Sequence, residues 1–193
     1  MQDQPTLIIV ATSAAPTTAR PWADTVHDWR HLQALAEAGT HSGLPTLCVL
    51  PPHRGSLPIE LPTSCLVMES PQGLATDGLG LVRAVQATAQ SVGWLVLPTQ
   101  GTAPTPHTIR AVAQALLRHP LAAPSHGGTR GVPLGFGAEL YSELVRIRQF
   151  QDLEKLMLRY PYADVATEHP GIRPVTTPPP PTTEPNRHEK RSP

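Results

Sequence analysis

Strand-length apolar segments alternate with amphipathic helices along this chain, and this alternation restricts the fold more than any other feature. Residues 6–11 are apolar and rich in β-branched side chains, and residues 47–50 and 94–97 have a similar character. Continuous apolar strands of this kind are typical of parallel sheets that helices cover on both faces. The three clearest helices are predicted at residues 24–38, 78–90 and 105–119. The pattern therefore predicts an α/β domain with a mostly parallel sheet.

Local signals indicate where several elements begin and end. Gly39 is expected to end the first helix, because glycine readily adopts the left-handed conformation found after helix C-termini. Thr105 is expected to cap the helix that starts at Pro106. The remaining predicted elements are shorter: strands at residues 65–68, 121–123, 132–136 and 163–167, the last at a sheet edge, and helices at 138–147 and 152–160.

Length and composition predict one folded domain with a tail. The chain has 193 residues, of which 39% are hydrophobic, enough for one well-buried core. We expect this domain to cover residues 1–173. Residues 174–193 are rich in proline and almost free of apolar side chains, so they cannot bury enough surface to offset their ordering entropy. We predict that this tail is disordered.

The charge balance and the apolar segments exclude two classes of partner. The chain has 15 basic and 15 acidic residues, which gives no basic surface for nucleic acid. No apolar run approaches the roughly 20 residues that a membrane span requires. Without a basic and hydrophobic leader at its N-terminus, the chain is expected to be cytoplasmic. In that reducing compartment Cys48 and Cys65, each within an apolar run, are expected to be buried core residues.

Three segments of the chain resemble one enzyme family. Gly78-Leu-Gly80 opens a helix, residues 94–98 form a strand followed by the Thr-Pro helix start, and residues 129–141 read Thr-Arg-Gly-Val-Pro-Leu-Gly-Phe-Gly-Ala-Glu-Leu-Tyr. Together they resemble the MobA-like nucleotidyltransferases, in particular the molybdenum cofactor cytidylyltransferases. The likeness covers most of residues 6–178 and is specific from about residue 78 to residue 172.

This resemblance implies a fold, a reaction and a set of site residues. It implies a single three-layer, Rossmann-like domain of the nucleotide-diphospho-sugar transferase type, which moves a nucleoside monophosphate from CTP or GTP to molybdopterin with magnesium as cofactor. Ligands of such sheets lie beyond the carboxyl ends of the strands. The implied catalytic positions are Gln100, where the family has its metal-binding Asp, and Asp77. The implied nucleotide- or cofactor-binding residues are Ala11, Thr12, Ser13, Arg20, Gly78, Gly80, Arg130 and Gly131.

The acidic residues that this chemistry needs are missing from the matching positions. Gln100 is a neutral amide, and no Asp or Glu occurs between Asp77 and Glu139. Divalent metals such as magnesium bind chiefly through carboxylate oxygens, so we assign no metal ligands. The first loop lacks the glycines of the family, and only Arg20 remains there to meet a phosphate. These losses predict a catalytically degenerate domain.

Two functions from different classes therefore remain open. One is an active nucleotidyltransferase in which Gln100, Arg20, Arg130 and Asp77 replace the lost groups. The other is a non-catalytic nucleotide- or cofactor-binding protein, or a scaffold, that assists molybdoenzyme maturation proteins. Individual residues are equally open: Gly78 and Gly80 fit either a ligand approach or a tight turn, and Arg130 fits either an anion contact or an ordinary hairpin position.

Overall fold

The computed structural model describes residues 3–11, 26–50, 60–70, 77–99 and 102–168, without the side chains of residues 26–28 and 77. The other segments, including the predicted tail, lie outside the described residues. The elements, in chain order, are β1 (Thr6–Val10), α1 (Val26–His41), β2 (Thr46–Leu50), β3 (Cys65–Glu69), α2 (Asp77–Ala87), β4 (Gly93–Pro98), α3 (Pro106–Ala115), β5 (Leu121–His126), β6 (Thr129–Arg130), β7 (Leu134–Gly137), a short 3-10 helix (Ala138–Leu140), α4 (Tyr141–Leu144), α5 (Gln151–Arg159) and β8 (Ala163–Ala166).

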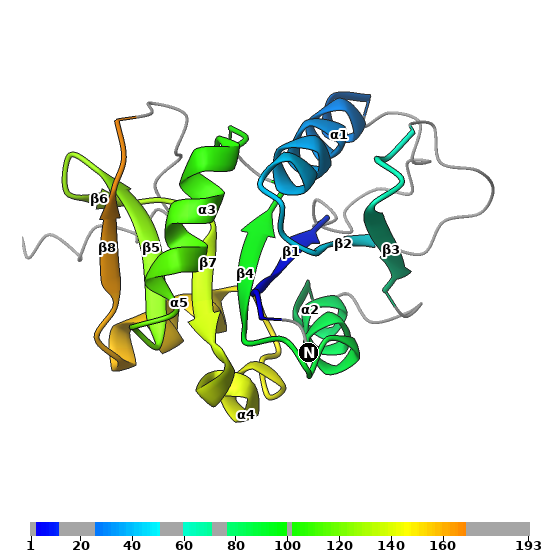
Figure 1. Ribbon diagram of the computed structural model, residues 1–193. Helices are drawn as coiled ribbons and strands as arrows, with labels where there is room; N and C mark the ends of the chain where they lie inside the picture. Colours follow the sequence, from blue (N-terminus) through cyan, green and yellow to red (C-terminus); the bar gives the residue numbers. More distant parts are fainter. Residues whose placement is uncertain (1–2, 12–25, 51–59, 71–76, 100–101, 169–193) are drawn as a thin grey trace, which may run out of the picture.

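The strands form one mixed sheet in the order β3-β2-β1-β4-β7-β5-β6, with β8 also paired with β5 (Figure 1). Strands β1 to β4 are parallel, and β7 is antiparallel to both β4 and β5, so β5 runs in the same direction as β4. Ser125 of β5 pairs with both Arg130 of β6 and Ala166 of β8, which places β8 at the edge of the sheet. The predicted α/β class with a mostly parallel sheet and the predicted edge strand are confirmed.

Helices cover both faces of this sheet. Gly39 of α1 lies against Leu7 on one face, and Arg110 of α3 donates a hydrogen bond to the carbonyl of His41, so α1 and α3 share that face (Figure 1). Gly80 of α2 lies against Val49, whose side chain points to the opposite face because side chains alternate along a strand. None of the described helices is both long and apolar enough to cross a membrane.

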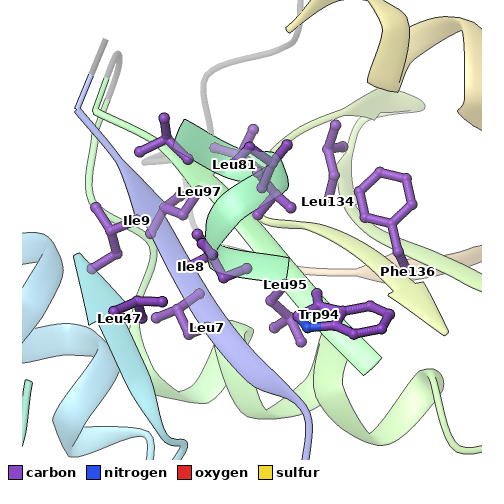
Figure 2. Close-up of a cluster of buried hydrophobic side chains, with 14 of the residues drawn as sticks. Leu7, Ile8, Ile9, Leu47, Leu81, Trp94, Leu95, Leu97, Leu134 and Phe136 are labelled. Carbon is purple, nitrogen blue, oxygen red and sulfur yellow. The ribbon is translucent and has the colours of Figure 1, made fainter. Parts of the chain in front are cut away.

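The core is built around β1, whose five residues are all buried. Figure 2 shows its side chains on both faces of the sheet, among those of β2, α2 and β4. Trp94 of β4 pairs with Phe136 of β7, and both rings are almost completely buried. The indole of Trp94 donates a hydrogen bond to the hydroxyl of Thr88 at 2.9 Å. Because aromatic rings bury large areas, this pair joins the antiparallel half of the sheet to the parallel half.

The prediction that Gly39 ends the first helix was wrong. Helix α1 continues through Gly39 to His41, and the turn that follows contains Gly43, whose φ is 78°. A Cβ atom at Gly39 would lie 2.7 Å from a methyl carbon of Leu7 and 2.9 Å from the hydroxyl of Thr46. Gly39 therefore permits the helix to approach the sheet closely, and the left-handed turn residue lies one helical turn further along.

The helix predicted at residues 138–147 is shorter than expected. It consists of the 3-10 turn and the four residues of α4, although Leu144 and Ile147 are buried as the periodicity predicted. The chain turns at Arg148 and Gln149 because the carboxylate of Asp152 accepts hydrogen bonds from both backbone N–H groups, each at 3.1 Å. Elsewhere, α2 and α3 end a few residues earlier than predicted, and the strand predicted at 132–136 begins at Leu134.

The turn held by Asp152 packs against the start of α2. A Cβ atom on Gly78 would lie 2.5 Å from the carbonyl carbon and oxygen of Arg148 and 2.9 Å from the backbone nitrogen of Gln149. A Cβ atom on Gly80 would instead meet side chains, at 2.8 Å from Val49 and 3.3 Å from Ser70. The first turn of α2 is thus confined by backbone on one side and by movable side chains on the other.

We predict that Gly78→Ala destabilises the fold more than Gly80→Ala. Overpacking of this kind costs about 1–3 kcal/mol. The obstacle at Gly78 is backbone, whereas a change of rotamer at Val49 relieves the clash at Gly80. The free energy of unfolding is measured by urea denaturation for both variants. A double variant that combines Gly80→Ala with Val49→Ala serves as the control, because the smaller side chain at residue 49 removes the clash with the new methyl group. Equal losses for the two glycines, or no relief by Val49→Ala, would contradict this account of the α2 packing.

We also predict a pH-dependent contribution from Asp152. The ammonium of Lys155, 2.9 Å away, and the N–H groups of Arg148 and Gln149 lower the pKa of Asp152 from 3.8 to about 2. A carboxyl group with a lower pKa in the folded state stabilises the fold above its unfolded pKa and loses this effect as the pH falls through the folded value. The difference in melting temperature between the wild type and Asp152→Asn should therefore be largest above pH 4 and shrink toward pH 2. Lys155→Gln serves as the control that keeps the carboxylate, and a difference independent of pH would refute the prediction.

Candidate functional site

The carboxyl ends of the parallel strands meet at one edge of the sheet. Backbone hydrogen bonds continue one residue past the strands there: Ser70 donates to Leu50, Ala11 to Val49, and Thr99 to Val10. Segments 12–25, 51–59, 71–76 and 100–101 each follow one of these strand ends and lie outside the described residues. The crevice beyond such strand ends is where sheets of this type bind ligands. We call this edge, defined by Ala11, Ser70, Thr99 and the end of β5, the carboxyl edge.

Several predicted site residues have no described position. Thr12, Ser13 and Arg20 belong to the segment after β1, and Gln100 belongs to the segment after β4. Asp77 is the first residue of α2, but its side chain is not described. These assignments stay predictions. What the structure adds is that β1 and β4 are adjacent, so the segments containing Arg20 and Gln100 leave the sheet from neighbouring strands.

Gly78 and Gly80 lie in the first turn of α2, and both are buried. Their lack of side chains is accounted for by the contacts with the 148–149 turn, Val49 and Ser70. Close packing of helix against chain thus explains both glycines, a reading that the sequence alternatives did not include. A nucleotide contact by the backbone at this helix start stays a prediction.

Arg130 lies in the β5–β6 hairpin, where it pairs with Ser125 close to the end of β5. Its guanidinium carbon lies 4.1 Å from the centre of the Tyr162 ring, a cation–π contact. Its Nε atom is buried without a hydrogen-bond partner. Stacking uses the face of the guanidinium and none of its five N–H donors, so the contact orients the group without saturating it. The aromatic partner was missed in the sequence, since only the pairing of β6 and β8 with β5 brings these residues together.

The backbone N–H groups of two other predicted binding residues are already engaged. Gly131 donates to the carbonyl of Pro124 at 2.7 Å, and Ala11 donates to the carbonyl of Val49 at 2.9 Å. A ligand phosphate held by a loop needs free N–H groups that point toward it. Neither residue offers its own N–H in this arrangement, so any such donors would come from the segments that follow them.

The described carboxylates do not form a divalent-metal site. Within the part of the chain that the structure describes, no group of three or more His, Cys, Asp and Glu side chains gathers. Glu139, the first acidic residue after Asp77 in the sequence, follows the antiparallel strand β7 and so lies at the opposite edge of the sheet. A hard cation such as magnesium needs several oxygen ligands in one place. Magnesium can also be held by one or two carboxylates together with substrate phosphates, and Glu69, the last residue of β3, is the described carboxylate at the carboxyl edge that could take such a part.

Comparisons with family models and with curated protein sequences give no match. Solved structures do match over almost the whole chain. One is Rv0371c from Mycobacterium tuberculosis H37Rv in complex with manganese, at 18% identity and a TM-score of 0.63, covering 92% of this chain and 95% of that chain. A second is the 2-C-methyl-D-erythritol 4-phosphate cytidylyltransferase of Thermus thermophilus, at 17% identity and a TM-score of 0.56, covering 91% of this chain and 94% of that chain.

A third similar structure is the nucleotidyl transferase Mth528 from Methanothermobacter, at 14% identity and a TM-score of 0.58, with 87% of this chain and 89% of that chain covered. Identities this low establish the fold alone, because one fold supports many chemistries. The mixed, mostly parallel sheet with helices on both faces is the Rossmann-like α/β fold shared by nucleotidyltransferases and nucleotide-diphospho-sugar transferases.

Proposed function

We propose that this chain is a degenerate nucleotidyltransferase domain of the MobA-like type, which binds a nucleotide at the carboxyl edge without metal-assisted transfer. The observation that carries the proposal is the distribution of charge around that edge. The described side chains form no group of three or more metal ligands; Glu139, the first acidic residue after Asp77, lies at the opposite edge, and Glu69 at the end of β3 is a single carboxylate at the carboxyl edge. Arg130 is a cation whose backbone pairs close to the end of β5 and whose guanidinium reaches back over Tyr162, the residue before β8, with its Nε unpartnered among the described residues.

Arg130 is the residue that we expect to contact an anionic ligand. A guanidinium pairs with phosphate oxygens through two parallel N–H bonds, and stacking on an aromatic ring keeps its plane in a fixed orientation. Tyr162 supplies that ring. Arg20, which leaves the sheet after β1, is the second proposed phosphate contact, and the ligands implied by the resemblance are CTP or GTP and a molybdopterin-like cofactor.

Calorimetric titration of CTP and of GTP into the full chain tests this proposal. We expect one nucleotide to bind with the same affinity in the presence and absence of magnesium. Arg130→Gln should weaken binding by about 10-fold or more, because hydrogen bonds to charged groups contribute about 1.5–3 kcal/mol. Arg118→Gln is the matched control, since this exposed arginine precedes β5 and lies at the opposite edge of the sheet. Absence of binding, or equal affinity of the wild type and Arg130→Gln, would overturn the proposal.

A second candidate is an active, metal-dependent transferase, and the manganese complex of the similar Rv0371c structure favours it. In that case Asp77 and Gln100 supply part of the metal site from positions outside the described side chains. Nucleotide binding would then require magnesium or manganese, and pyrophosphate would be released when a molybdopterin-like acceptor is added. Asp77→Asn should abolish the metal dependence if this candidate is correct and leave binding unchanged if the degenerate domain is correct.

A third role, as a non-catalytic scaffold for molybdoenzyme maturation proteins, requires no nucleotide. It predicts that neither CTP nor GTP binds, with or without magnesium. The same titration therefore separates the three roles: binding without metal, binding that depends on metal, and no binding.

A further inference from the structure

The two cysteines of the chain lie side by side in the parallel half of the sheet. Thr46 of β2 is the register partner of Cys65 of β3, and Cys48 is two residues beyond Thr46, so the two thiols point to the same face. Their sulfur atoms are 3.1 Å apart, and both residues are free cysteines. The sequence predicted that each is buried, which the structure confirms, but it gave no sign that they meet.

The two thiols differ in acidity. The hydrogen bond with Cys65, together with burial, raises the pKa of the Cys48 thiol well above its ordinary value. The same hydrogen bond, with Cys48 as donor, lowers the pKa of the Cys65 thiol. A thiolate that accepts a hydrogen bond from a neighbouring thiol is the nucleophilic partner of such a pair. Cys65 is therefore the residue expected to react first, with Cys48 positioned to react with the product.

Cys65 lies on the strand at one end of the described sheet. Among the described strands, β3 is the last on its side of the sheet and pairs only with β2. Cys65 is its first residue and follows a turn closed by the bond from its own N–H to the carbonyl of Pro62. In a parallel pair, with strands about 4.8 Å apart and a rise of about 3.3 Å per residue, diagonal neighbours have Cα atoms roughly 8 Å apart, and a disulfide requires about 4.4–6.8 Å. A bond between the sulfurs therefore requires the start of β3 to shift slightly along β2, which brings Cys65 closer to Cys48 and which a strand paired on one side permits.

We propose that Cys48 and Cys65 form an oxidisable dithiol that closes to an intramolecular disulfide when the protein meets a hydroperoxide. The Cys65 thiolate attacks one oxygen of hydrogen peroxide, the O–O bond breaks, and a sulfenic acid and hydroxide are formed; the hydroxide takes up the proton that the Cys65 thiol released and becomes the first water. The sulfur of Cys48 then attacks the sulfenic sulfur, its proton is transferred to the departing hydroxyl group, and water leaves. Two thiols are oxidised by two electrons, and one peroxide is reduced to two waters.

The disulfide would fix the edge strand to its neighbour. Val49, the residue after Cys48, and Ser70, the residue after β3, are the side chains that confine Gly80 of α2. A shift of β3 along β2 therefore changes the space around the first turn of α2. The dithiol lies on the face of the sheet that α1 covers, whereas α2 covers the other face. An effect of the disulfide on α2 is therefore carried by strands β2 and β3.

The test is peroxide titration of the full chain, reduced beforehand and freed of reductant. We expect both thiols to be lost together, the intact mass to fall by two hydrogen atoms, and peptide mapping to link residue 48 to residue 65 in a chain that stays monomeric on a non-reducing gel. Dithiothreitol should restore both thiols. Disulfide-linked dimers, or thiols that survive peroxide at concentrations that oxidise free cysteine, would overturn the proposal.

Two matched variants test the order of the steps. In Cys48→Ser the remaining Cys65 should form a sulfenic acid that dimedone traps, because no second thiol resolves it. In Cys65→Ser the remaining Cys48, whose residue is fully buried, should react at least 10-fold more slowly. Equal rates in the two variants would refute Cys65 as the attacking residue. The mass and mapping results on the wild type stand independently of whether either variant folds.

Discussion

The position of β1 between β2 and β4 is the constraint on which the rest of the structure depends. Its side chains are buried on both faces, and its backbone pairs in register with both neighbours. A strand in this position has no contact with solvent, so α1 must cover one face and α2 the other, and each helix needs a glycine where it comes closest. Gly39 provides this against Leu7, and Gly80 against Val49. The arrangement also brings the ends of β1, β2 and β4 to one edge, and thereby determines where a ligand can be bound.

The reversal of direction at β7 decides at which edge of the sheet two charged residues lie. Because β7 is antiparallel to β4, the acidic residue that follows it, Glu139, emerges at the edge opposite to the strand ends. The hairpin before β7 has the opposite effect, since it returns Arg130 to a position beside Ser125 at the end of β5. The described part of this edge has the hairpin of Arg130 and the single carboxylate of Glu69 but no group of three or more metal ligands, which suits an anionic ligand better than a metal held by protein side chains alone. This physical difference is the basis for proposing binding without metal-assisted transfer.

The sequence predicted what depends on local pattern and missed what depends on contacts between distant segments. Apolar strands and the Thr105 cap were predictable, because burial on both faces and capping leave a signal within a few residues. The role of Gly39 was not, because a helix-ending glycine and a glycine that allows close packing look the same without the partner strand. The early end of α4 was missed for a similar reason. The carboxylate that accepts hydrogen bonds from the N–H groups of Arg148 and Gln149 belongs to Asp152, in the next helix. Of the site, Arg130 was singled out, but Tyr162 was not, and the residues after β1 and β4 still rest on the resemblance alone.

Strand β2 links the two proposals physically. Because side chains alternate along a strand, Cys48 points to the face that α1 covers and Val49 to the face that α2 covers. Cys48 contacts Cys65, and the next residue, Val49, contacts Gly80 at the start of α2. Within the described sheet, β3 is paired on one side only, and it contributes both Cys65 and, one residue past its end, Ser70. A bond that draws Cys65 along β2 toward Cys48 therefore acts on the same strand that leads into the segment before α2. If the nucleotide contacts the start of α2, the reduced and oxidised forms should differ in nucleotide affinity, whereas a ligand held only near Arg130, on the far side of β4, should bind both forms alike.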